Sequence, residues 1–320
     1  MRILVVGAGS VGLYFGGRLA QSGAEVSVVV RSDYETAKRF GYDISSIAGD
    51  FHFSPHLVLR DAAEYPGAAD YVILTTKVLP TVDRVALLRP TIRSSETVIV
   101  LIQNGIDIEE EIKSAFPENE LLSTIAYIGA SRPAPGKVLH QGSGVLQMGV
   151  YPRGISPALE RLAAAFAAVG VKCEMMDDIV FTRWNKLLWN LPYNPVSVLA
   201  GGADTARMSR RDELEKLCAD LMSEVIRVAN AAGVALTEVL AEKQREFTRN
   251  FPPYKTSMLQ DFEAGRALEV EAILGNTLRV ARRCGVDIPR IECCYALLKS
   301  VDELNRKRHS PDRSAENRGG

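Results

Sequence analysis

The stretch that decides the fold lies at the start of the chain and reads Arg2-Ile3-Leu4-Val5-Val6-Gly7-Ala8-Gly9-Ser10-Val11-Gly12. The apolar run at residues 2–6 is typical of a strand buried in a parallel sheet. It enters a G-x-G-x-x-G turn at residues 7–12, and a helical pattern follows from about Val11 to Gln21. A strand, a glycine-rich turn and a helix in this order predict the start of a doubly wound α/β sheet.

The glycines of this turn have different tasks. Gly7 permits the tight turn, Gly9 lets a pyrophosphate approach the backbone, and Gly12 lets helix and strand pack closely. A phosphate would sit at the helix N-terminus, where free N–H groups and the helix dipole favour negative charge. We therefore predict a dinucleotide site that also includes Ser10 and Val11. The alternative is a glycine turn that is merely structural.

The end of the second predicted strand, Glu25 to Val30, bears on the choice of nucleotide. An NAD-preferring fold usually carries an acidic residue there, which bonds the ribose 2′-hydroxyl, but this strand runs into Arg31. The guanidinium of Arg31 offers donors that suit a 2′-phosphate, so NADPH is favoured. In the alternative interpretation Arg31 is solvated and Asp33 contacts the ribose, which would reverse the preference.

Two further buried strands are predicted at residues 71–75 and 98–102, each followed by a helical stretch. Ligands of a doubly wound sheet bind at the carboxyl ends of the strands. Lys77 follows the first strand and Asn104 follows the second, so cofactor and substrate are expected to meet near them. The structural alternatives are a solvated lysine at a helix start and a simple Asn104-Gly105 turn.

The alternation of strands and helices ends near Met176. Beyond Asp177-Asp178, helical patterns cover residues 179–193, 211–232, 236–247, 257–264, 268–284 and 290–305. We predict a Rossmann-type NADP-binding domain at residues 1–176, an all-α substrate and catalytic domain at residues 177–305, and a polar tail without a site at residues 306–320.

The first of these helical patterns carries a narrow row of polar residues. Lys186, Asn190 and Asn194 recur every four residues, while leucine and tryptophan side chains cover the other sides. This polar stripe is either solvated at the domain surface or part of a cleft, and the scarcity of other charges favours the cleft. Pro192 lies inside the pattern and predicts a kink between the two asparagines.

Two more polar residues stand at predicted helix starts. Ser257 follows Pro252-Pro253 and is placed to cap the helix at residues 257–264. Glu269 opens the next helix among apolar neighbours, where a carboxylate is favourable in any case. Each residue therefore has a structural interpretation beside the functional one.

Composition excludes several classes of partner. Hydrophobic residues make up 47% and charged residues 24%, and 38 basic residues are balanced by 39 acidic ones for a net charge of −1. Neither a nucleic-acid partner nor a membrane is expected, because the charges are mixed and the apolar runs are short. The five cysteines lack metal-like spacing, so we predict reduced thiols, no metal site and a cytoplasmic location. The chain opens on a strand rather than a cleavable leader.

Together these segments resemble the ketopantoate reductase family, whose members reduce 2-dehydropantoate to pantoate with NADPH. The matching segments are the glycine-rich turn, Thr76-Lys77, Gln103-Asn104-Gly105, Trp184-Asn185-Lys186 with Asn190 and Asn194, Ser257-Met258-Leu259-Gln260-Asp261, and Glu269. They cover nearly the whole chain except the tail. The glycine-rich turn is common to many dehydrogenases, whereas the lysine with two following asparagines, the Ser257 segment and the later glutamate are far more specific.

The resemblance implies that Lys186 gives a proton to the carbonyl oxygen and that Glu269 holds Lys186 and the substrate in place. We expect burial to lower the pKa of Lys186 toward neutrality and Glu269 to oppose that shift. One departure is Leu268, where many members of the family have a threonine. This departure bears on the local support of Glu269 and on substrate choice.

By the same resemblance, Asn190, Asn194 and Ser257 would bind the hydroxyl and carboxylate of the substrate. Asn104 would lie between the nicotinamide and the substrate and would serve both. A relative of the same fold that reduces another 2-keto or 3-keto acid is the nearest alternative, since small pocket differences change binding by only about 1–3 kcal/mol.

The resemblance assigns Lys77 and Arg31 to the cofactor, with Arg31 on the 2′-phosphate of NADPH. An alternative from another class is a regulator that senses NADPH without chemistry. The proton donor at Lys186 argues against it, because a sensor has no need for one. A homodimer is possible, but no heptad repeat or obvious patch specifies it.

Overall fold

The structure, a computed structural model, describes residues 1–309. It divides into two compact units. The first unit consists of residues 1–104 and 108–182, and the second of residues 105–107 and those from Arg183 onward. The domain boundaries that we derived from the sequence stay predictions.

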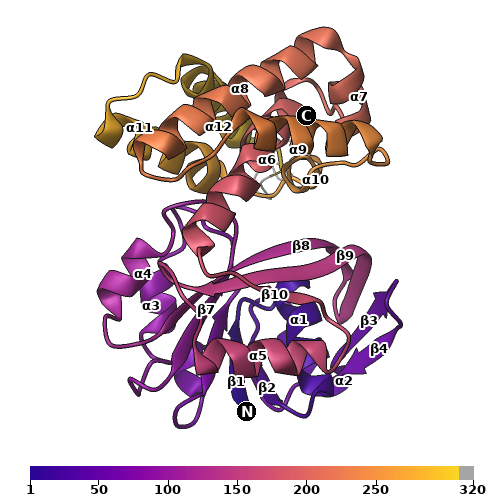
Figure 1. Ribbon diagram of the computed structural model, residues 1–320. Coiled ribbons are helices and arrows are strands. Elements are labelled where there is room, and N and C mark those ends of the chain that lie inside the picture. The colour runs from indigo at the N-terminus through magenta and orange to yellow at the C-terminus, as the bar shows by residue number, and fades with distance from the viewer. Residues whose placement is uncertain (310–320) are drawn as a thin grey trace, which may run out of the picture. The chain divides into compact units, whose positions relative to one another are not determined.

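A single sheet forms the centre of the first unit (Figure 1), with the strand order β4-β3-β9-β8-β7-β6-β1-β2-β5, and β10 beside β9. The strands are β1 Arg2–Val6, β2 Glu25–Val29, β3 Tyr42–Ser46, β4 Phe51–Phe53, β5 Val58–Leu59, β6 Tyr71–Leu74, β7 Val98–Ile102, β8 Leu121–Ala134, β9 Lys137–Val150 and β10 Cys173–Met175. Neighbouring strands from β5 to β8 run parallel, and β8 and β9 form a long antiparallel hairpin. The carboxyl ends of β1, β6 and β7 therefore lie side by side at one edge of the sheet.

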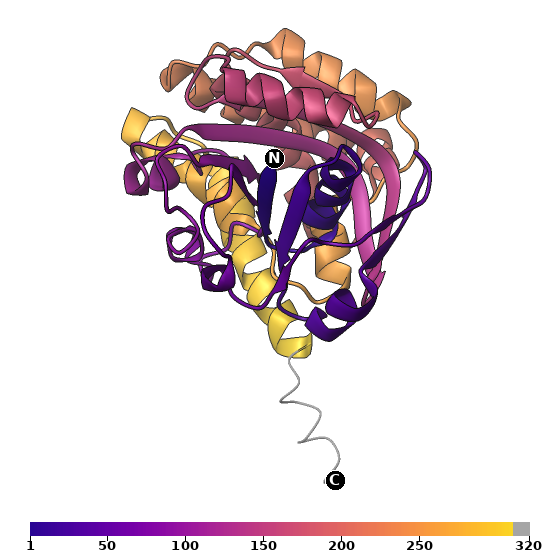
Figure 2. The ribbon, with the colours of Figure 1, turned by 90° about the horizontal axis from the view of Figure 1, so that it is seen from below.

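Helices cover both faces of this sheet. They are α1 Ser10–Gln21, α2 Tyr34–Phe40, the 3-10 helix Ala62–Glu64, α3 Arg84–Leu88, α4 Glu110–Ala115 and α5 Pro157–Ala167. Ile3 and Val5 of β1 belong to a core that includes α1 and α5, whereas Leu4 and Val6 belong to a core that includes α3 and α4. Successive strand residues point to opposite faces, so the all-apolar β1 needs a cover on both. Figure 1 shows α5 in front of the strands, and Figure 2 shows the same unit from below.

The second unit is helical. Its helices are α6 Ile179–Leu199, α7 Thr205–Arg210, α8 Asp212–Ala231, α9 Glu238–Asn250, α10 Ser257–Glu263, a π-helical turn Glu271–Gly275, α11 Asn276–Cys284 and α12 Pro289–His309. The first four residues of α6 belong to the first unit, and α8 packs against α9, α11 and α12. The predicted fold class, a Rossmann-type α/β part followed by an all-α part, is confirmed.

Helix α6 is longer than the sequence indicates. We expected it to end at Tyr193, but it continues through Pro192 and Pro195 to Leu199. Each proline removes only one backbone donor, and the residues beyond them pack in the core, with Val196 2% and Val198 5% exposed. Packing therefore outweighs the local cost of the prolines.

Two other helix boundaries differ from the predictions. The helix predicted at residues 268–284 begins later, at Val270, and its first turn is the π-helical turn Glu271–Gly275, which leads into α11; such turns are frequent at functional sites. Helix α12 continues to His309, so the first four residues of the predicted tail are helical, and residues 310–320 lie outside the described residues. Within residues 1–309, no helix has the length and apolarity that a membrane span requires. All five cysteines lie in this range, and each is a free thiol.

Candidate functional site

The glycine-rich turn joins β1 to α1, and its three glycines differ in their surroundings. Gly7 has a φ of +103°, and a Cβ on it would lie 2.7 Å from the backbone nitrogen of Thr76. A Cβ on Gly12 would collide with the Thr75 hydroxyl and lie 2.6 Å from the carbonyl oxygen of Gly7. A Cβ on Gly9 would meet nothing within 4 Å. Gly7 and Gly12 are thus required by packing within the protein, whereas the space over Gly9 is open to a ligand.

Helix α1 begins without a side-chain cap. Its N-cap residue is Gly9, no acidic residue stands in the first turn, and the Ser10 hydroxyl donates instead to the carbonyl oxygen of Ala130 at 3.1 Å. The first N–H groups of a helix have no partner within the helix, and together with the dipole they favour an anion. The half-buried Ser10 and Val11 therefore stand where a pyrophosphate would accept their N–H groups.

The two residues that bear on coenzyme choice have opposite environments. Arg31 is exposed, directly after β2. Asp33 is buried, with its side chain 1% exposed, and its carboxylate forms an ion pair with Arg132 of β8. The backbone N–H of Gly136 donates to the same carboxylate at 3.3 Å. Only Arg31 thus stands open to a ligand from outside, whereas Asp33 is engaged within the protein.

The segments after β6 and β7 carry Lys77 and Asn104, both half-buried. Gln103, which is 7% exposed, links the two segments, because its side-chain amide donates to the carbonyl oxygen of Thr76 at 2.5 Å. Arg84 of α3 donates to the Gln103 side-chain oxygen at 3.3 Å. The sequence placed Lys77 and Asn104 at neighbouring strand ends, but it did not assign this linking role to Gln103.

In the second unit, the polar stripe of α6 is withdrawn from solvent. Asn190 is 8% and Asn194 2% exposed, and Lys186 is half-buried. The interpretation of this stripe as a solvated surface is therefore wrong. The side-chain oxygen of Asn194 is buried and has no hydrogen-bond partner among residues 1–309. A buried amide oxygen without a partner is costly, so it is a natural acceptor for a ligand hydroxyl.

Burial has a large effect on Lys186. Loss of hydration, the largest cause, and the nearby guanidinium of Arg183 lower the pKa of its ammonium, which is about 7. The carboxylate of Glu269 acts in the opposite direction and raises the pKa of Lys186. The predicted shift toward neutrality and the opposing effect of Glu269 are thus confirmed, whereas the contribution of Arg183 was not foreseen. An amine with a pKa near 7 can both hold and release a proton at neutral pH.

The start of α10 differs from the prediction. Thr256, not Ser257, caps the helix, because its hydroxyl accepts the N–H of Leu259 at 3.1 Å. The buried Thr256 hydroxyl also lies 2.7 Å from that of Ser197 on α6, and Ser197 donates to the carbonyl oxygen of Asn194. Ser257 is exposed, so its hydroxyl does not serve as the cap. Serine and threonine can both cap a helix, and Thr256 is the one that also contacts α6, through Ser197.

Glu269 stands just before the π-helical turn and is half-buried. Its carbonyl oxygen accepts the N–H of Ile273 at 3.2 Å, and the preceding Leu268 is buried with its N–H bonded to Asp302 at 3.1 Å. The backbone on both sides of Glu269 is therefore held in place. The apolar Leu268 packs inside the unit, so it supports Glu269 by burial and a backbone bond rather than through a hydroxyl.

Residues 105–107 are part of the second unit, although they follow β7 directly. The carbonyl oxygen of Gly105 accepts from Arg183 at 3.0 Å, and that of Ile106 accepts from the side chain of Asn276. The N–H of Ile106 donates to the carbonyl oxygen of Ala272 at 3.3 Å. The sequence did not assign these roles to Arg183 and Asn276, although Asn276, a polar residue on the buried face of the 268–284 pattern, gave a usable signal.

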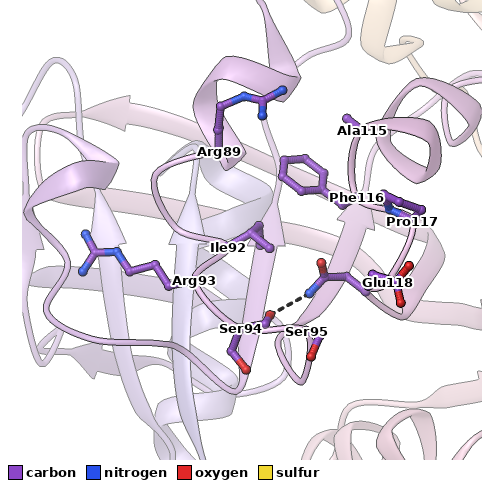
Figure 3. A pocket seen from close by; sticks show the side chains of 10 residues that line it. Arg89, Ile92, Arg93, Ser94, Ser95, Ala115, Phe116, Pro117 and Glu118 are labelled. Atoms are coloured by element: carbon purple, nitrogen blue, oxygen red, sulfur yellow. Dashed lines mark hydrogen bonds between the residues drawn. The ribbon is translucent and has the colours of Figure 1, made fainter.

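A shallow pocket of about 390 Å³ lies elsewhere on the first unit. It is lined by residues 89, 92–95 and 115–119, which precede β7 and β8, so it lies at the amino ends of these strands (Figure 3). There the side-chain amide of Asn119 donates to the carbonyl oxygen of Ser94 at 2.9 Å. The pocket is thus remote from the glycine-rich turn. Residues 1–309 contain no group of three or more metal-binding side chains placed to hold an ion.

Family models and a solved structure both match this chain over most of its length. The family described as ketopantoate reductase PanE/ApbA matches residues 3–153, and its C-terminal part matches residues 178–302. A solved structure of 2-dehydropantoate 2-reductase from Methylococcus capsulatus is 46% identical, with a TM-score of 0.90, over 95% of this chain and 98% of that one.

Two further comparisons differ in how much they show. The 2-dehydropantoate 2-reductase of Nostoc sp. is 32% identical over 94% of this chain and 95% of its own length. A solved D-mandelate dehydrogenase with NADH and anilino(oxo)acetate is 22% identical with a TM-score of 0.86, over 95% of this chain and 99% of that one. At that identity, the dehydrogenase shows a shared fold only.

Proposed function

The chain belongs to the ketopantoate reductase family of oxidoreductases, and we propose that it reduces 2-dehydropantoate to pantoate with NADPH, with Lys186 as the proton donor. This reaction would serve the formation of pantothenate and coenzyme A. The observation that carries the proposal is the partly buried Lys186, whose pKa is about 7, in line with two buried asparagines on α6. A cytoplasmic location and a homodimer stay predictions.

In the proposed reaction the 2-keto carbon accepts a hydride, which a bound nicotinamide supplies. Negative charge develops on the keto oxygen, and the Lys186 ammonium stabilises that charge and then gives up its proton to form the hydroxyl. Glu269 keeps more of the lysine in the protonated form, because its carboxylate raises the pKa of Lys186. Arg183 and burial favour release of the proton, so the groups around Lys186 balance proton retention against transfer.

Substrate binding is assigned to the asparagines of the stripe, Ser257 and Asn104. The buried side-chain oxygen of Asn194 would accept a substrate hydroxyl, and Asn190 would donate its amide N–H groups to the carboxylate. The exposed Ser257 hydroxyl is available for the same carboxylate, since Thr256 forms the helix cap. Asn104 would contact both the substrate and the nicotinamide, as the resemblance to the family implies.

The first unit fits a dinucleotide. The open space over Gly9 and the uncapped start of α1 suit a pyrophosphate, with Gly7 and Gly12 shaping the turn around it. The exposed Arg31 offers its guanidinium to a 2′-phosphate, and Lys77 stands at the carboxyl end of β6. These residues would bind and orient NADPH in its extended form.

The test is an assay of NADPH absorbance with 2-dehydropantoate, followed by a panel of other 2-keto and 3-keto acids. We expect the highest kcat/KM with 2-dehydropantoate. A higher value with another keto acid would assign the chain to that substrate, and the apolar Leu268 beside Glu269 is where such a difference would arise. NADPH binding without oxidation on any acid would identify a nucleotide sensor instead of a reductase.

A further inference from the structure

Arg132 of β8 connects the two parts of the first unit that surround the expected nucleotide. One nitrogen of its guanidinium donates to the carbonyl oxygen of Ala8, inside the glycine-rich turn, at 2.9 Å. A second guanidinium nitrogen forms the ion pair with Asp33. The carboxylate of Asp33 therefore lies within the span of one guanidinium group from the turn. Arg132 itself is 23% exposed in its side chain, and Asp33 only 1%.

The ion pair between Arg132 and Asp33 matters because of where Asp33 lies in the fold. Asp33 follows β2 by a few residues and stands about 20 residues after the glycine-rich turn, where an acidic residue of NAD-binding folds bonds the ribose 2′-hydroxyl. An uncompensated carboxylate at that place repels a 2′-phosphate. Here one carboxylate oxygen, Oδ2, is held by Arg132 and by the N–H of Gly136, whereas Oδ1 is buried without a hydrogen-bond partner among residues 1–309. Its charge still acts on its surroundings, because together with burial it raises the pKa of Tyr42.

We propose that Arg132 determines coenzyme specificity by masking the carboxylate of Asp33, that is, by neutralising its charge through the ion pair. Arg31 can then bind a 2′-phosphate without competition from that negative charge. This inference rests on the proposed binding of NADPH and adds a residue to it. Arg132 is a positioning residue, since it acts on the nucleotide through Asp33 and the backbone of Ala8. Loss of its charge would expose a carboxylate that pairs with Arg31 or with the 2′-hydroxyl of NADH.

The test compares kcat/KM for NADPH and NADH in the native protein, Arg132→Met, Asp33→Asn and the double variant. We expect Arg132→Met to lower the NADPH-to-NADH ratio by about tenfold or more, because like charges at short range cost at least that much. The double variant should restore the native ratio, since it removes the charge that was unmasked. Arg2→Met is the matched control, because Arg2 forms an exposed ion pair with Asp70 at the opposite end of β1 and should leave the ratio unchanged.

Several results would overturn the inference. If Arg132→Met weakens both nucleotides equally, or if the double variant keeps the lowered ratio, Arg132 supports the turn without masking Asp33. Asp33→Asn decides the matter even if Arg132→Met fails to fold, because a masked carboxylate predicts a ratio within about threefold of native. A ribose-binding carboxylate predicts instead a loss of NADH use by about tenfold or more. If the native protein binds neither 2′,5′-ADP nor 5′-AMP, the proposed function fails, and this inference fails with it.

Discussion

The glycine-rich turn of the first unit and the polar stripe of the second unit are built in opposite ways. The turn presents backbone groups to an open space, because nothing lies within 4 Å of the Cβ position of Gly9. The stripe is made of side chains that burial keeps from water, with Asn194 2% exposed and the pKa of Lys186 lowered to about 7. The turn can bind a ligand with little loss of stability. The stripe lowers the stability of the fold, because burial withdraws its polar groups from water, and a bound ligand restores the lost hydrogen bonds.

The largest expected effect comes from a substitution in the stripe. Lys186→Ala removes the group that stabilises the developing alkoxide, and we expect kcat to fall by about 10²–10⁴-fold. The affinity for NADPH should stay native, because the residues assigned to the nucleotide are in the first unit. Steady-state rates and nucleotide titration measure the two effects separately.

Lys216→Ala is the matched control for that variant, since Lys216 is an exposed lysine of α8 paired with Asp220. It should leave kcat within about twofold of native. Native turnover in Lys186→Ala would remove Lys186 from the mechanism and leave the stripe without a catalytic role.

The turn is probed by a pair of identical substitutions. Gly9→Ala places a Cβ in open space with an extended backbone, so folding should be unaffected while the new methyl group obstructs the pyrophosphate. We expect NADPH affinity to fall by about 5- to 150-fold, as an overlap of about 1–3 kcal/mol implies. Gly12→Ala should instead lower the free energy of unfolding by about 1–3 kcal/mol, because its Cβ overlaps the Gly7 carbonyl oxygen and the Thr75 hydroxyl.

Urea unfolding and nucleotide titration on both variants give the measurement. Equal losses of stability in Gly9→Ala and Gly12→Ala would contradict the view that the space over Gly9 is reserved for a ligand.

Burial of the Lys186 charge should lower the free energy of unfolding, and this effect can be measured. The pKa of Lys186 is about 7 in the folded chain and near 10.5 in the unfolded one, so the unfolded chain binds the proton more tightly. The resulting penalty is fully present below pH 7 and disappears as the pH rises toward 10. We therefore expect Lys186→Met to raise the free energy of unfolding by about 1–3 kcal/mol at pH 6.

The increase in the free energy of unfolding of Lys186→Met should become smaller as the pH approaches 10. Urea unfolding at pH 6, 8 and 10 tests this trend. A gain that does not change with pH would mean that the charge of Lys186 is not the source of the cost.

The smallest expected effect is a shift of the pH profile when Glu269 is replaced. Activity should decline as the pH rises through about 7, because the ammonium is lost. Glu269→Gln removes a carboxylate that raises the pKa of Lys186, so the decline should move to lower pH by about one unit. The pH profile of kcat measures the shift. A displacement toward higher pH, or none, would show that Glu269 acts on the substrate alone.

The turn and the stripe also differ in how far the sequence predicts them. The turn is a local feature, since β1, residues 7–12 and α1 follow one another, and their residue types fix the conformation of each. The spacing of the polar stripe was equally readable, and the scarcity of charges around it favoured a cleft, but the segments that bury it could not be read, because they pack from elsewhere in the unit. Interactions between distant segments, such as Arg132 with Asp33 and Ser197 with Thr256, have no signal in a single sequence.

Local rules also failed where packing opposed them. The helical pattern was expected to end near Tyr193, but buried side chains carry α6 through Pro195 to Leu199. Strand β5 has only two residues, too few for a periodic pattern, and its position comes from pairing with β2.

The route of the chain between residues 104 and 108 limits how this protein can be dissected. The chain leaves the first unit after Asn104, returns at Ile108 and leaves again after Thr182. A recombinant fragment that starts at Arg183 would omit the backbone that bonds to Ala272, Asn276 and Arg183 itself. The helical part is thus not an independent module that a single cut in the gene would release, and a fragment without residues 105–107 should be less stable than the same part within the full chain.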